Sequence, residues 1–553
     1  MIEQRQSHFG RLLTICQPYW SSSDRRVAVV LVCALLGLVA VDLGTSAWLA
    51  TLTKRLFDVI DARNAAGLTT LTIACVFAIL FGGLYFATLE FLRQTLEFRW
   101  RKGLMIYVIA GWLGRMNSQT GYRGTNVDNP EQRIEEDIKL FVEHFLRLSI
   151  YFVISCTTFT YYSYLLWDNS PAVPIFGLPT KAYLLSVAVG FGMLNNIASH
   201  FAGRRLTTAL ADQQRREADL RRVLTRQRSM AAHIAANGGW SEEQRRLHGL
   251  IGGLESNWSS LKRNTFTLNF ANRAFYWYGS FVPLVAAAPF VLSKALTLGT
   301  FMQSQLAFSW VAASVASFAN AYQEVALWRA SFRRLLAVMT STAHAVTSEL
   351  AIVHHENTHI EIANLRIRRE DGATITAIDS LRIGPAEHWE ICGPTGSGKS
   401  LLLNTLAGQW PYATGQISFP RDRRVMVISE KRYIPELALK AALVYPESPE
   451  AIGDEVCTDA LVVVGLSRLA QRLGSTIEWM SILSSGEQVQ FLMARVLVHK
   501  PAFCFFDAFS GILSADIEQS LLCIVKRRLP DMSLICTTAN PSPQGVARRH
   551  YLQ

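Results

Sequence analysis

Six long apolar stretches limit the fold of this chain more than any other feature of its sequence. They lie near residues 27–50, 68–91, 145–167, 179–201, 270–293 and 298–320. Each is long enough for a helix that crosses a bilayer, which needs ~20 apolar residues. Because lipid cannot satisfy exposed backbone N–H and C=O groups, stretches of this kind cross as helices. We therefore predict a multi-pass α-helical membrane domain with six transmembrane helices.

The charges that flank these stretches predict the sidedness of the domain. The connections between the second and third stretches, and between the fourth and fifth, are long and rich in arginine, whereas the others carry little beyond Lys54, Arg55, Arg63, Lys181 and Lys294. Basic residues accumulate on the cytoplasmic side of membrane proteins. We predict that both termini and both arginine-rich segments are cytoplasmic. Residues 8–20 are expected to form an interfacial helix on the inner leaflet, and no cleavable signal is expected.

The overall charge does not indicate a nucleic-acid partner. The chain has 54 Lys and Arg against 43 Asp and Glu, a net charge of +11. The arginines crowd beside the apolar stretches, which is typical of a protein whose partner is the lipid bilayer. The nine cysteines are scattered and include no CxxC pair, so we predict reduced thiols rather than disulfides or a metal site. We expect no nucleic acid to bind.

The character of the sequence changes after the last apolar stretch. From Ile360 onward apolar residues alternate with polar ones, and short strand-like runs alternate with helical ones. We predict three parts: a transmembrane domain with cytoplasmic helix extensions at 1–345, a linker at 346–356, and an α/β nucleotide-binding domain at 357–553.

A glycine-rich phosphate loop lies inside this α/β domain. The run Gly393-Pro394-Thr395-Gly396-Ser397-Gly398-Lys399-Ser400 follows the strand-like residues 389–392 and opens a helical run at Leu401. In such a loop, backbone N–H groups surround phosphates, the lysine reaches the terminal phosphates and the last hydroxyl binds Mg²⁺. We therefore predict binding of ATP and Mg²⁺, with Ser400 and Asp507 as the metal ligands. The predicted nucleotide contacts are Gly393, Thr395, Gly396, Ser397, Gly398, Lys399, Ser400, Leu401 and Asp507.

A second motif agrees with the first. Leu483-Ser484-Ser485-Gly486-Glu487-Gln488 precedes a helical run and the apolar strand-like run 503–506, which ends in Asp507. It resembles the signature motif of ATP-binding cassette (ABC) proteins. The resemblance implies that Ser484, Ser485, Gly486 and Glu487 present a hydroxyl and N–H groups at a helix N-terminus to a γ-phosphate held by another subunit.

The order of six apolar stretches followed by this domain resembles an ABC transporter half of the exporter type. The run 127–138, which reads VDNPEQRIEEDI, is similar to one in the SbmA/BacA-like permeases and in their relatives with a fused ATP-binding cassette. That group includes the peroxisomal fatty-acyl half-transporters. Further similar runs are Ala307-Phe308, Tyr322, Trp328-Arg329-Ala330, Arg334-Leu335, residues 408–412 and Tyr433-Ile434-Pro435.

The resemblance implies a transporter subunit of the bacterial inner (cytoplasmic) membrane. Its relatives move peptides, peptide antibiotics, hydrophilic solutes or fatty-acyl derivatives, so the implied solute is peptide-like or otherwise amphiphilic. The cassettes of such proteins work in pairs. We favour a homodimer over a heterodimer with a competent cassette chain.

The departures from the family concentrate around the hydrolytic machinery. Glu430 stands where the family has glutamine, Ala508 where it has the glutamate after Asp507, Ser514 where it has an aspartate, and Ala539 where it has the switch histidine. A positioned base is worth roughly 10²–10⁴ in rate. We therefore predict that the degenerate cassette has no intact catalytic residue, and that it binds ATP but hydrolyses it weakly.

Two other classes of function remain open at this point. The chain is alternatively a gradient-driven secondary permease with a vestigial cassette, or a membrane receptor or immunity protein that uses nucleotide as a ligand. Two family glutamates align with Ala232 and Trp240, which argues against proton coupling, although a small gap in the alignment would restore one of them at Glu242 or Glu243. Polar residues within or at the ends of the apolar stretches, which mark a solute path or a helix end, are Asp42, Glu90, Asn195, Asn196 and Arg273.

Overall fold

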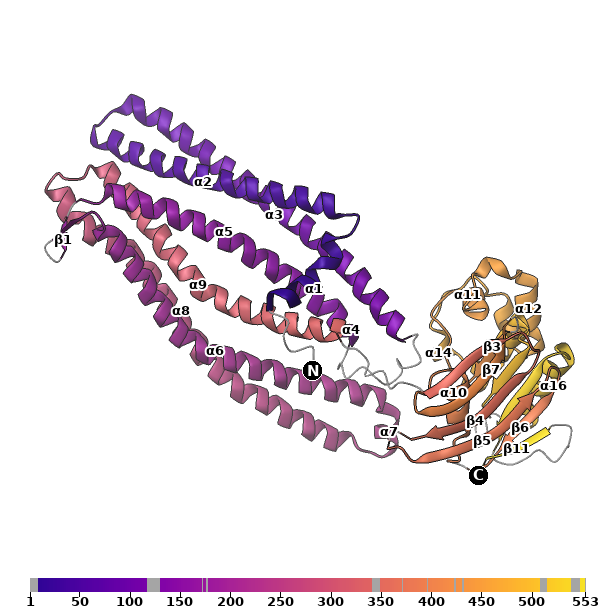
Figure 1. Ribbon diagram of the computed structural model, residues 1–553. Helices are drawn as coiled ribbons and strands as arrows, with labels where there is room; N and C mark the ends of the chain where they lie inside the picture. Colours follow the sequence, from indigo (N-terminus) through magenta and orange to yellow (C-terminus); the bar gives the residue numbers. More distant parts are fainter. Residues whose placement is uncertain are drawn as a thin grey trace. The chain divides into compact units, whose positions relative to one another are not determined.

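The computed structural model describes residues 8–116, 130–171, 173–175, 178–340, 349–369, 371–394, 396–421, 424–429, 432–507, 515–538 and 548–552. The chain divides into two compact units, one of residues 1–109 with 129–339 and the other of residues 110–128 with 340–553. The first is built from long helices and the second from two sheets with helices, as the ribbon shows (Figure 1).

In the helical unit the predicted transmembrane stretches lie within continuous helices. Its elements are α1 His8–Trp20, α2 Arg25–Asp61, α3 Ala65–Met116, α4 Pro130–Gln132, the π-helix η2 Arg133–Asp137, α5 Ile138–Asn169, β1 Val173–Ile175, β2 Leu178–Thr180, α6 Tyr183–Ser229, α7 Ala231–Ala236, α8 Trp240–Leu292 and α9 Leu298–Thr340. β1 and β2 form an antiparallel hairpin. The fourth predicted stretch was placed four residues too early, because 178–180 pair in this hairpin and the helix begins at Tyr183.

Five helical segments in the described part of the chain are long and apolar enough to cross a membrane. They are Arg25–Asp61, Gly67–Gly114, Arg133–Asn169, Tyr183–Ser229 and Trp240–Leu292. The sixth predicted stretch, 298–320, does form a helix, α9, but does not reach the same hydropathy. A count of six spans therefore stays a prediction.

Polar side chains that bond to neighbouring helices explain the lower hydropathy of α9. Gln303 donates from Nε2 to the carbonyl of Ala50 on α2 at 3.3 Å and accepts from Asn169 on α5 at 3.1 Å. The hydroxyls of Ser155 and Ser317 lie 2.8 Å apart, across α5 and α9. A buried polar group needs such partners, so α9 is polar because it packs inside the bundle.

An apolar core surrounds these bonds where five helices meet. Its members are small and large residues in alternation, which lets the helices approach closely. They are Ala50 on α2, Tyr162 and Leu166 on α5, Leu184 and Ala188 on α6, Ala287 on α8, and Ala307, Phe308, Val311 and Ala312 on α9. Asn196, predicted as a polar residue within a stretch, donates to the carbonyl of Val315 at 2.7 Å and so has a structural bond between α6 and α9.

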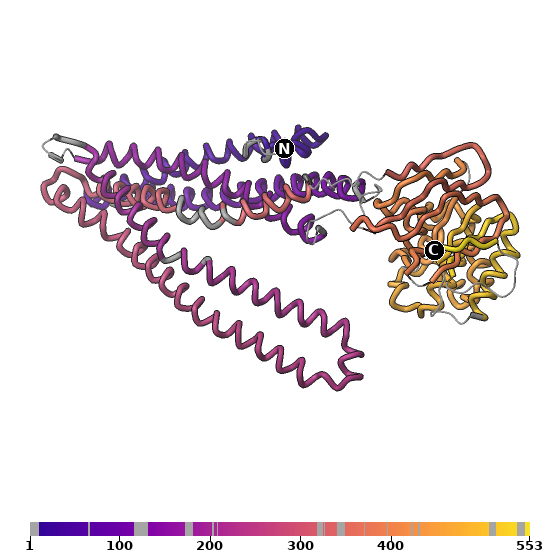
Figure 2. The backbone as a smooth tube through the Cα atoms, turned by 60° about the horizontal axis from the view of Figure 1, so that its bottom comes forward, coloured from indigo at the N-terminus to yellow at the C-terminus, as the bar shows by residue number. Residues whose placement is uncertain are grey.

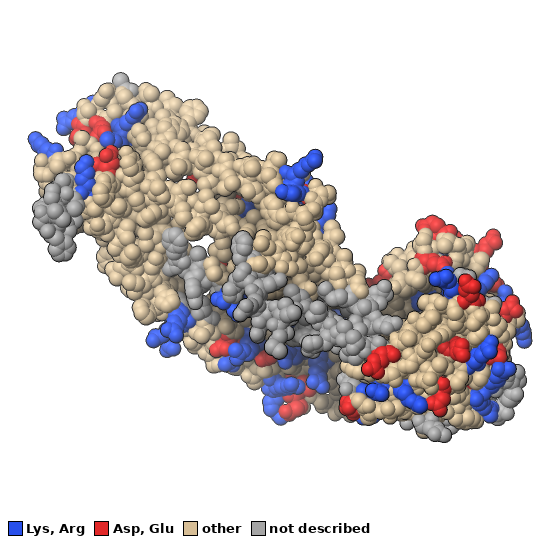
Figure 3. Space-filling model, in the orientation of Figure 1, with Lys and Arg blue, Asp and Glu red and all other residues tan. Residues whose placement is uncertain are grey.

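The outer surface of the helical unit suits a lipid environment. The space-filling view shows a broad band free of Lys, Arg, Asp and Glu across this unit, with charged side chains at its ends (Figure 3). Large apolar side chains are exposed along α3, among them Phe77, Ile79, Leu80, Leu84 and Phe86. An apolar patch of this size on a single chain marks a membrane or protein contact.

An aromatic cluster anchors α1 to the rest of the bundle. Tyr19 is 1% exposed and stacks on Trp100 of α3, with ring centroids 6.1 Å apart. Trp100 in turn contacts Phe141 and Phe145 of α5, which contact Trp328 of α9. Helix α1, the predicted interfacial helix, therefore packs on α3 through its rings, and Trp100 continues the ring cluster to α5.

An ion pair joins the start of α5 to the end of α9. Arg334 donates from Nε to the two carboxylate oxygens of Asp137 at 3.0 and 2.9 Å, and Asp137 is only 4% exposed. Asp137 lies in η2, within the run 127–138, and Arg334 lies in another of the runs that resemble the SbmA/BacA-like group. These two distant runs thus meet in space.

Helices α6 and α8 form a long antiparallel pair joined by α7. Both views show them side by side, diverging from the other helices toward α7 (Figures 1 and 2). The side chain of Asn257 on α8 donates to the carbonyl of Ala209 on α6 at 3.1 Å and to Gln213 at 3.0 Å. The segment predicted as helix extensions thus forms this pair of helices, and its cytoplasmic location stays a prediction.

The α/β unit contains two sheets with helices around them. Its strands are β3 Glu349–His355, β4 Ile360–Arg368, β5 Thr374–Ile383, β6 His388–Cys392, β7 Ala413–Pro420, β8 Val425–Ile428, β9 Phe503–Phe506, β10 Ser533–Thr538 and β11 Arg548–Tyr551. Its helices are α10 Lys399–Leu406, α11 Leu439–Val444, η3 Pro449–Ala451, α12 Asp454–Val463, α13 Ser467–Ala470, α14 Trp479–Ile482, α15 Ser485–His499 and α16 Ala515–Arg528.

The sheets place the motifs of the sequence at one edge. One sheet is entirely parallel, in the order β11-β6-β10-β9-β8, and the other has the order β3-β7-β4-β5. Parallel strands bring their carboxyl ends to the same edge of a sheet, so the loops after β6 and β9 leave from one side. β3 lies in the segment predicted as a linker and pairs with β7.

Candidate functional site

The phosphate loop joins β6 to α10. Gly396 has φ of 90° and Gly398 of 88°, which L side chains rarely adopt. A Cβ atom on Gly398 would also lie 2.7 Å from Oγ1 of Thr376 on β5. The hydroxyl of Thr376 donates to the carbonyl of Ser397. Both the turn and its contact with β5 therefore require glycine at position 398.

The side chains of the loop fit a phosphate group. Lys399 donates from Nζ to the carbonyls of Gly393 and Pro394 at 2.7 and 2.8 Å. Oγ of Ser397 is buried and has no hydrogen-bond partner among the described residues, so it is free to bond to a phosphate oxygen. Ser400 and Leu401 follow in the first turn of α10, with Ser400 exposed. When bound, Mg²⁺ would supply positive charge beside the terminal phosphates.

Asp507 lies at the same edge of the parallel sheet. It directly follows β9, is 7% exposed, and accepts a hydrogen bond from Oγ1 of Thr537 on β10 at 2.6 Å. Its own N–H donates to the carbonyl of Ile428. Because β10 alone separates β6 from β9, the phosphate loop and Asp507 lie two strand spacings apart, roughly 10 Å.

The signature motif begins helix α15. Ser484 is its N-cap: its Oγ accepts from the N–H of Glu487 at 3.3 Å, and the Glu487 carboxylate accepts from the N–H of Ser484 at 2.9 Å. This reciprocal capping box fixes the first turn, which contains Ser485 and Gly486. An ion pair with Arg468, together with the N–H of Ser484, holds the pKa of Glu487 below its usual value. The hydroxyl of Ser484 and the turn behind it are thus held in place.

Five predicted site positions lie outside the described residues. They are Thr395 in the phosphate loop and the four departures Glu430, Ala508, Ser514 and Ala539. Their roles stay predictions from the sequence.

Four residues that contact the predicted site were missed in the sequence. Thr376 and Thr537 bond to the phosphate loop and to Asp507, Arg432 donates to the carbonyl of Ser485 at 2.9 Å, and Arg468 pairs with Glu487. They lie on other strands, on a loop and, in the case of Arg468, on helix α13, at no fixed spacing from the motifs. Only the fold could have identified them.

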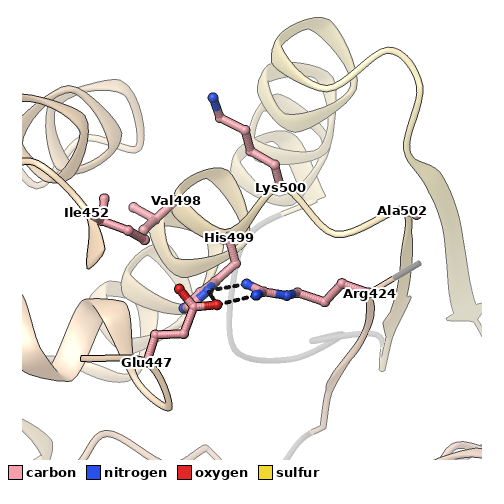
Figure 4. Close-up of a pocket in the computed structure, with 7 residues that line it drawn as sticks. All are labelled: Arg424, Glu447, Ile452, Val498, His499, Lys500 and Ala502. Atoms are coloured by element: carbon pink, nitrogen blue, oxygen red, sulfur yellow. Dashed lines mark hydrogen bonds and ion pairs between the residues drawn. The ribbon is translucent and has the colours of Figure 1, made fainter. Parts of the chain in front are cut away.

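The α/β unit also has an open cavity of 450 Å³ at the C-terminal end of α15. Figure 4 shows Arg424, Glu447 and His499 turned toward one another, with Lys500 pointing away. Arg424 donates to Nδ1 of His499 at 2.8 Å, so Nε2 carries the proton and donates to the carbonyl of Tyr445 at 3.1 Å. Burial lowers the pKa of His499, and Arg424 lowers it further. This group therefore holds a neutral histidine.

Three cavities lie among the described residues of the helical unit, and Trp310 lines two of them. One, of 570 Å³, lies between α6, α8 and α9 and carries amide and hydroxyl groups from Asn195, Ser199, Asn272 and Ser280. The other, of 890 Å³, lies between α5 and α9 and is mostly apolar. Asn195, a predicted polar position, thus lines a cavity. Glu90 instead pairs with Arg93 on its own helix at 2.6 Å.

Comparison with known families identifies the chain. Residues 12–292, just over half of its length, match the family described as ABC transporter transmembrane region 2. This chain belongs to the ABC transporter family. Residues 378–509 of the transporter also match the family described simply as ABC transporter, a range that contains the phosphate loop, the signature motif and Asp507.

Related proteins share this architecture. The transporter is 26% identical over 547 residues to the inner membrane ABC transporter ATP-binding protein YddA of Escherichia coli (strain K12), covering 97% of this chain and 96% of the relative. It is 24% identical to the chloroplastic ABC transporter D family member 2 of Arabidopsis thaliana, covering 92% and 81%. These relatives agree with the group resemblance drawn from the sequence.

A solved structure supports the fold. A bacterial Atm1-family ABC exporter with ATP bound superposes with a TM-score of 0.71 at 16% identity, covering 96% of this chain and 94% of that one. The predicted fold class, a helical membrane domain followed by an α/β P-loop domain, is confirmed. The transporter is therefore a multi-pass membrane protein with the fold of an ABC exporter.

Proposed function

We propose that this chain is a half-transporter that binds ATP and Mg²⁺ and moves a peptide-like or other amphiphilic solute across the bacterial inner membrane. One observation carries the proposal: a phosphate loop and a capped signature helix are present in a cassette fused to the membrane region. The proposed nucleotide contacts are the residues of the loop from Gly393 to Leu401, with Ser400 and Asp507 toward Mg²⁺. YddA, an inner membrane protein by its name, supports the location.

The two-chain arrangement follows from the signature motif. Ser484, Ser485 and Gly486 would complete the nucleotide site of a second chain, because a γ-phosphate suits the N–H groups at a helix N-terminus. We favour a homodimer over a heterodimer. Both termini are proposed to be cytoplasmic on the basis of the arginine-rich segments. The domain limits 1–345, 346–356 and 357–553 stay a prediction.

Slow hydrolysis is the second part of the proposal. Ala508 offers a methyl group where a carboxylate would polarise water, and Ala539 lacks a ring that could contact a phosphate. Losses within one catalytic unit are not additive, so residual turnover is expected. ATP would then act mainly through binding.

Reconstitution into liposomes tests the function. We expect ATP-dependent movement of an amphiphilic solute with turnover well under ~1 s⁻¹, the lower end of ordinary enzyme rates. The double variant Ala508→Glu with Ala539→His should hydrolyse ATP faster, by roughly 10²-fold or more. Wild-type turnover above that limit would contradict slow hydrolysis. Solute movement that follows an imposed ion gradient and ignores ATP would favour the secondary permease instead.

A further inference from the structure

The 890 Å³ cavity between α5 and α9 has a lining that indicates its ligand. Its walls are dominated by aromatic and aliphatic side chains, and its volume lies in the ~300–1,000 Å³ range of small-molecule sites. The aromatic members are Phe145, Tyr151 and Phe152 on α5, and Trp310 and Trp328 on α9. Tyr151 and Phe152 are each 58% exposed and Trp310 is 43% exposed, so a ligand can reach them.

One charged residue, Glu324, lies among the described residues that line this cavity. Its carboxylate accepts from Nε and Nη2 of Arg147, at 3.0 and 2.9 Å, and its side chain is 32% exposed. A carboxylate has about four lone-pair positions. Two contacts with Arg147 therefore leave Glu324 able to accept a further charge-assisted bond.

Carboxylates outnumber guanidinium groups in the ion pairs beside Glu324. Arg147 is approached by Glu143 as well, at 3.9 Å, and it lies 3.1 Å from Nδ1 of His144, which is itself 3.8 Å from Glu324. Glu324 and Glu143 thus share one guanidinium group. The carboxylate end of the cavity attracts a cation and repels an anion.

We propose that this cavity binds lipophilic cations, molecules with an aromatic or aliphatic body and one positive charge. The aromatic walls take the apolar body and offer ring faces to the charge, an interaction worth roughly 0.5–2 kcal/mol. Glu324 supplies the counter-charge. The inference rests on the proposed transport function, within which it names the class of solute.

Dye binding tests this with matched probes. Rhodamine 6G and fluorescein share a xanthene ring system but carry opposite charges. The full-length protein in phosphatidylcholine nanodiscs, without nucleotide, should raise the anisotropy of rhodamine 6G saturably and leave fluorescein unchanged. Glu324→Gln should weaken rhodamine 6G binding about tenfold, the effect of one lost charge-assisted contact. It should also allow fluorescein to bind, because Arg147 then loses its nearer carboxylate partner.

Two further variants keep the test independent of folding. Glu143→Gln also removes a carboxylate near Arg147, but Glu143 does not line the cavity, so rhodamine 6G affinity should change less than twofold. Tyr151→Leu keeps an apolar side chain at an exposed position and should weaken binding about threefold by removing one ring face.

Several results would overturn the inference. Equal affinity for both dyes, tighter binding of fluorescein, or no effect of Glu324→Gln each contradict it. Binding of neither dye would assign the cavity to a neutral lipid or to a second copy of the chain. ATP binding is measured on the same samples. A wild-type protein that binds ATP but no cationic dye would refute only the choice of solute. A wild-type protein that does not bind ATP would refute the proposed function.

Discussion

At the scale of single residues, Lys399 controls the proposed nucleotide site. It has a positive charge that would lie beside the terminal phosphates, and its ammonium group donates to two carbonyls of its own loop. A hydrogen bond to a charged group is worth about 1.5–3 kcal/mol. These contacts make the loop ready to exchange carbonyl partners for phosphate oxygens.

The first prediction follows. Lys399→Ala should weaken ATP–Mg²⁺ binding roughly 10- to 100-fold, measured by titration with a fluorescent nucleotide. Arg527→Ala, which removes an exposed charge from α16, is the matched control and should bind like the wild type. Equal affinity in Lys399→Ala and the wild type would show that the loop does not hold the phosphates.

The second prediction concerns His499. Its pKa is lowered in the folded cassette, so the unfolded chain, with a value of about 6.5, binds the proton more readily. The stability from the neutral ring is present above pH ~6.5 and is lost as the pH falls below it, by at most about 1.4 kcal/mol per pH unit. The midpoint temperature of thermal unfolding should therefore decrease as the pH is lowered from 7.5 to 5.5.

The matched control separates His499 from other groups. His499→Gln removes the titration and should shrink this drop, although burial also lowers the pKa values of His388 and His550, so part of it remains. His233→Gln, at an exposed position on α7, should leave the drop intact. A pH dependence identical in the wild type and His499→Gln would refute the assignment.

At the scale of elements, α1 depends on one small residue. A Cβ atom at Gly103 on α3 would lie 2.7 Å from Cδ2 of Tyr19, whose ring stacks on Trp100. Neither ring can withdraw easily, because both are 1% exposed. The packing of α1 against α3 thus requires glycine at this position.

The third prediction tests this packing contact. Gly103→Ala should lower stability by about 1–3 kcal/mol, the usual effect of overpacking, and should make α1 more accessible to protease. Gly114→Ala lies on the same helix with no atom within 4 Å of its Cβ, so it should be neutral or slightly stabilising. Similar melting curves for both variants would contradict the close packing.

The elements also show what the sequence could predict. Apolar length predicted α2, α3, α5, α6 and α8. The glycine loop lies between a strand and a helix, and the signature motif opens a helix, as expected. Hydropathy alone could not establish α9 as a span, because Gln303 and Ser317 lower its mean hydropathy. Their hydrogen-bond partners on other helices cannot be predicted from the sequence. Nor could spacing find Thr376 or Arg432, which reach the site from a distant strand and loop.

At the scale of the whole molecule, the composition of the dimer decides how many nucleotide sites can work. A homodimer would have Ala508 and Ala539 in both sites, whereas a competent partner chain would restore one of them. The fourth prediction is a homodimer: native mass spectrometry of protein extracted from its own host should give twice 61.7 kDa. A complex that contains a second type of chain would contradict it and favour a heterodimer with one active site.

The capping box of Ser484 and Glu487 has a consequence for how fast two cassettes join. A capped helix end is already ordered before the two cassettes meet, so little conformational entropy is lost there on contact. Encounters between cassettes would then succeed at a rate set by diffusion and orientation rather than by local folding. Glu487→Ala should therefore slow the association of the cassettes more than it speeds their separation.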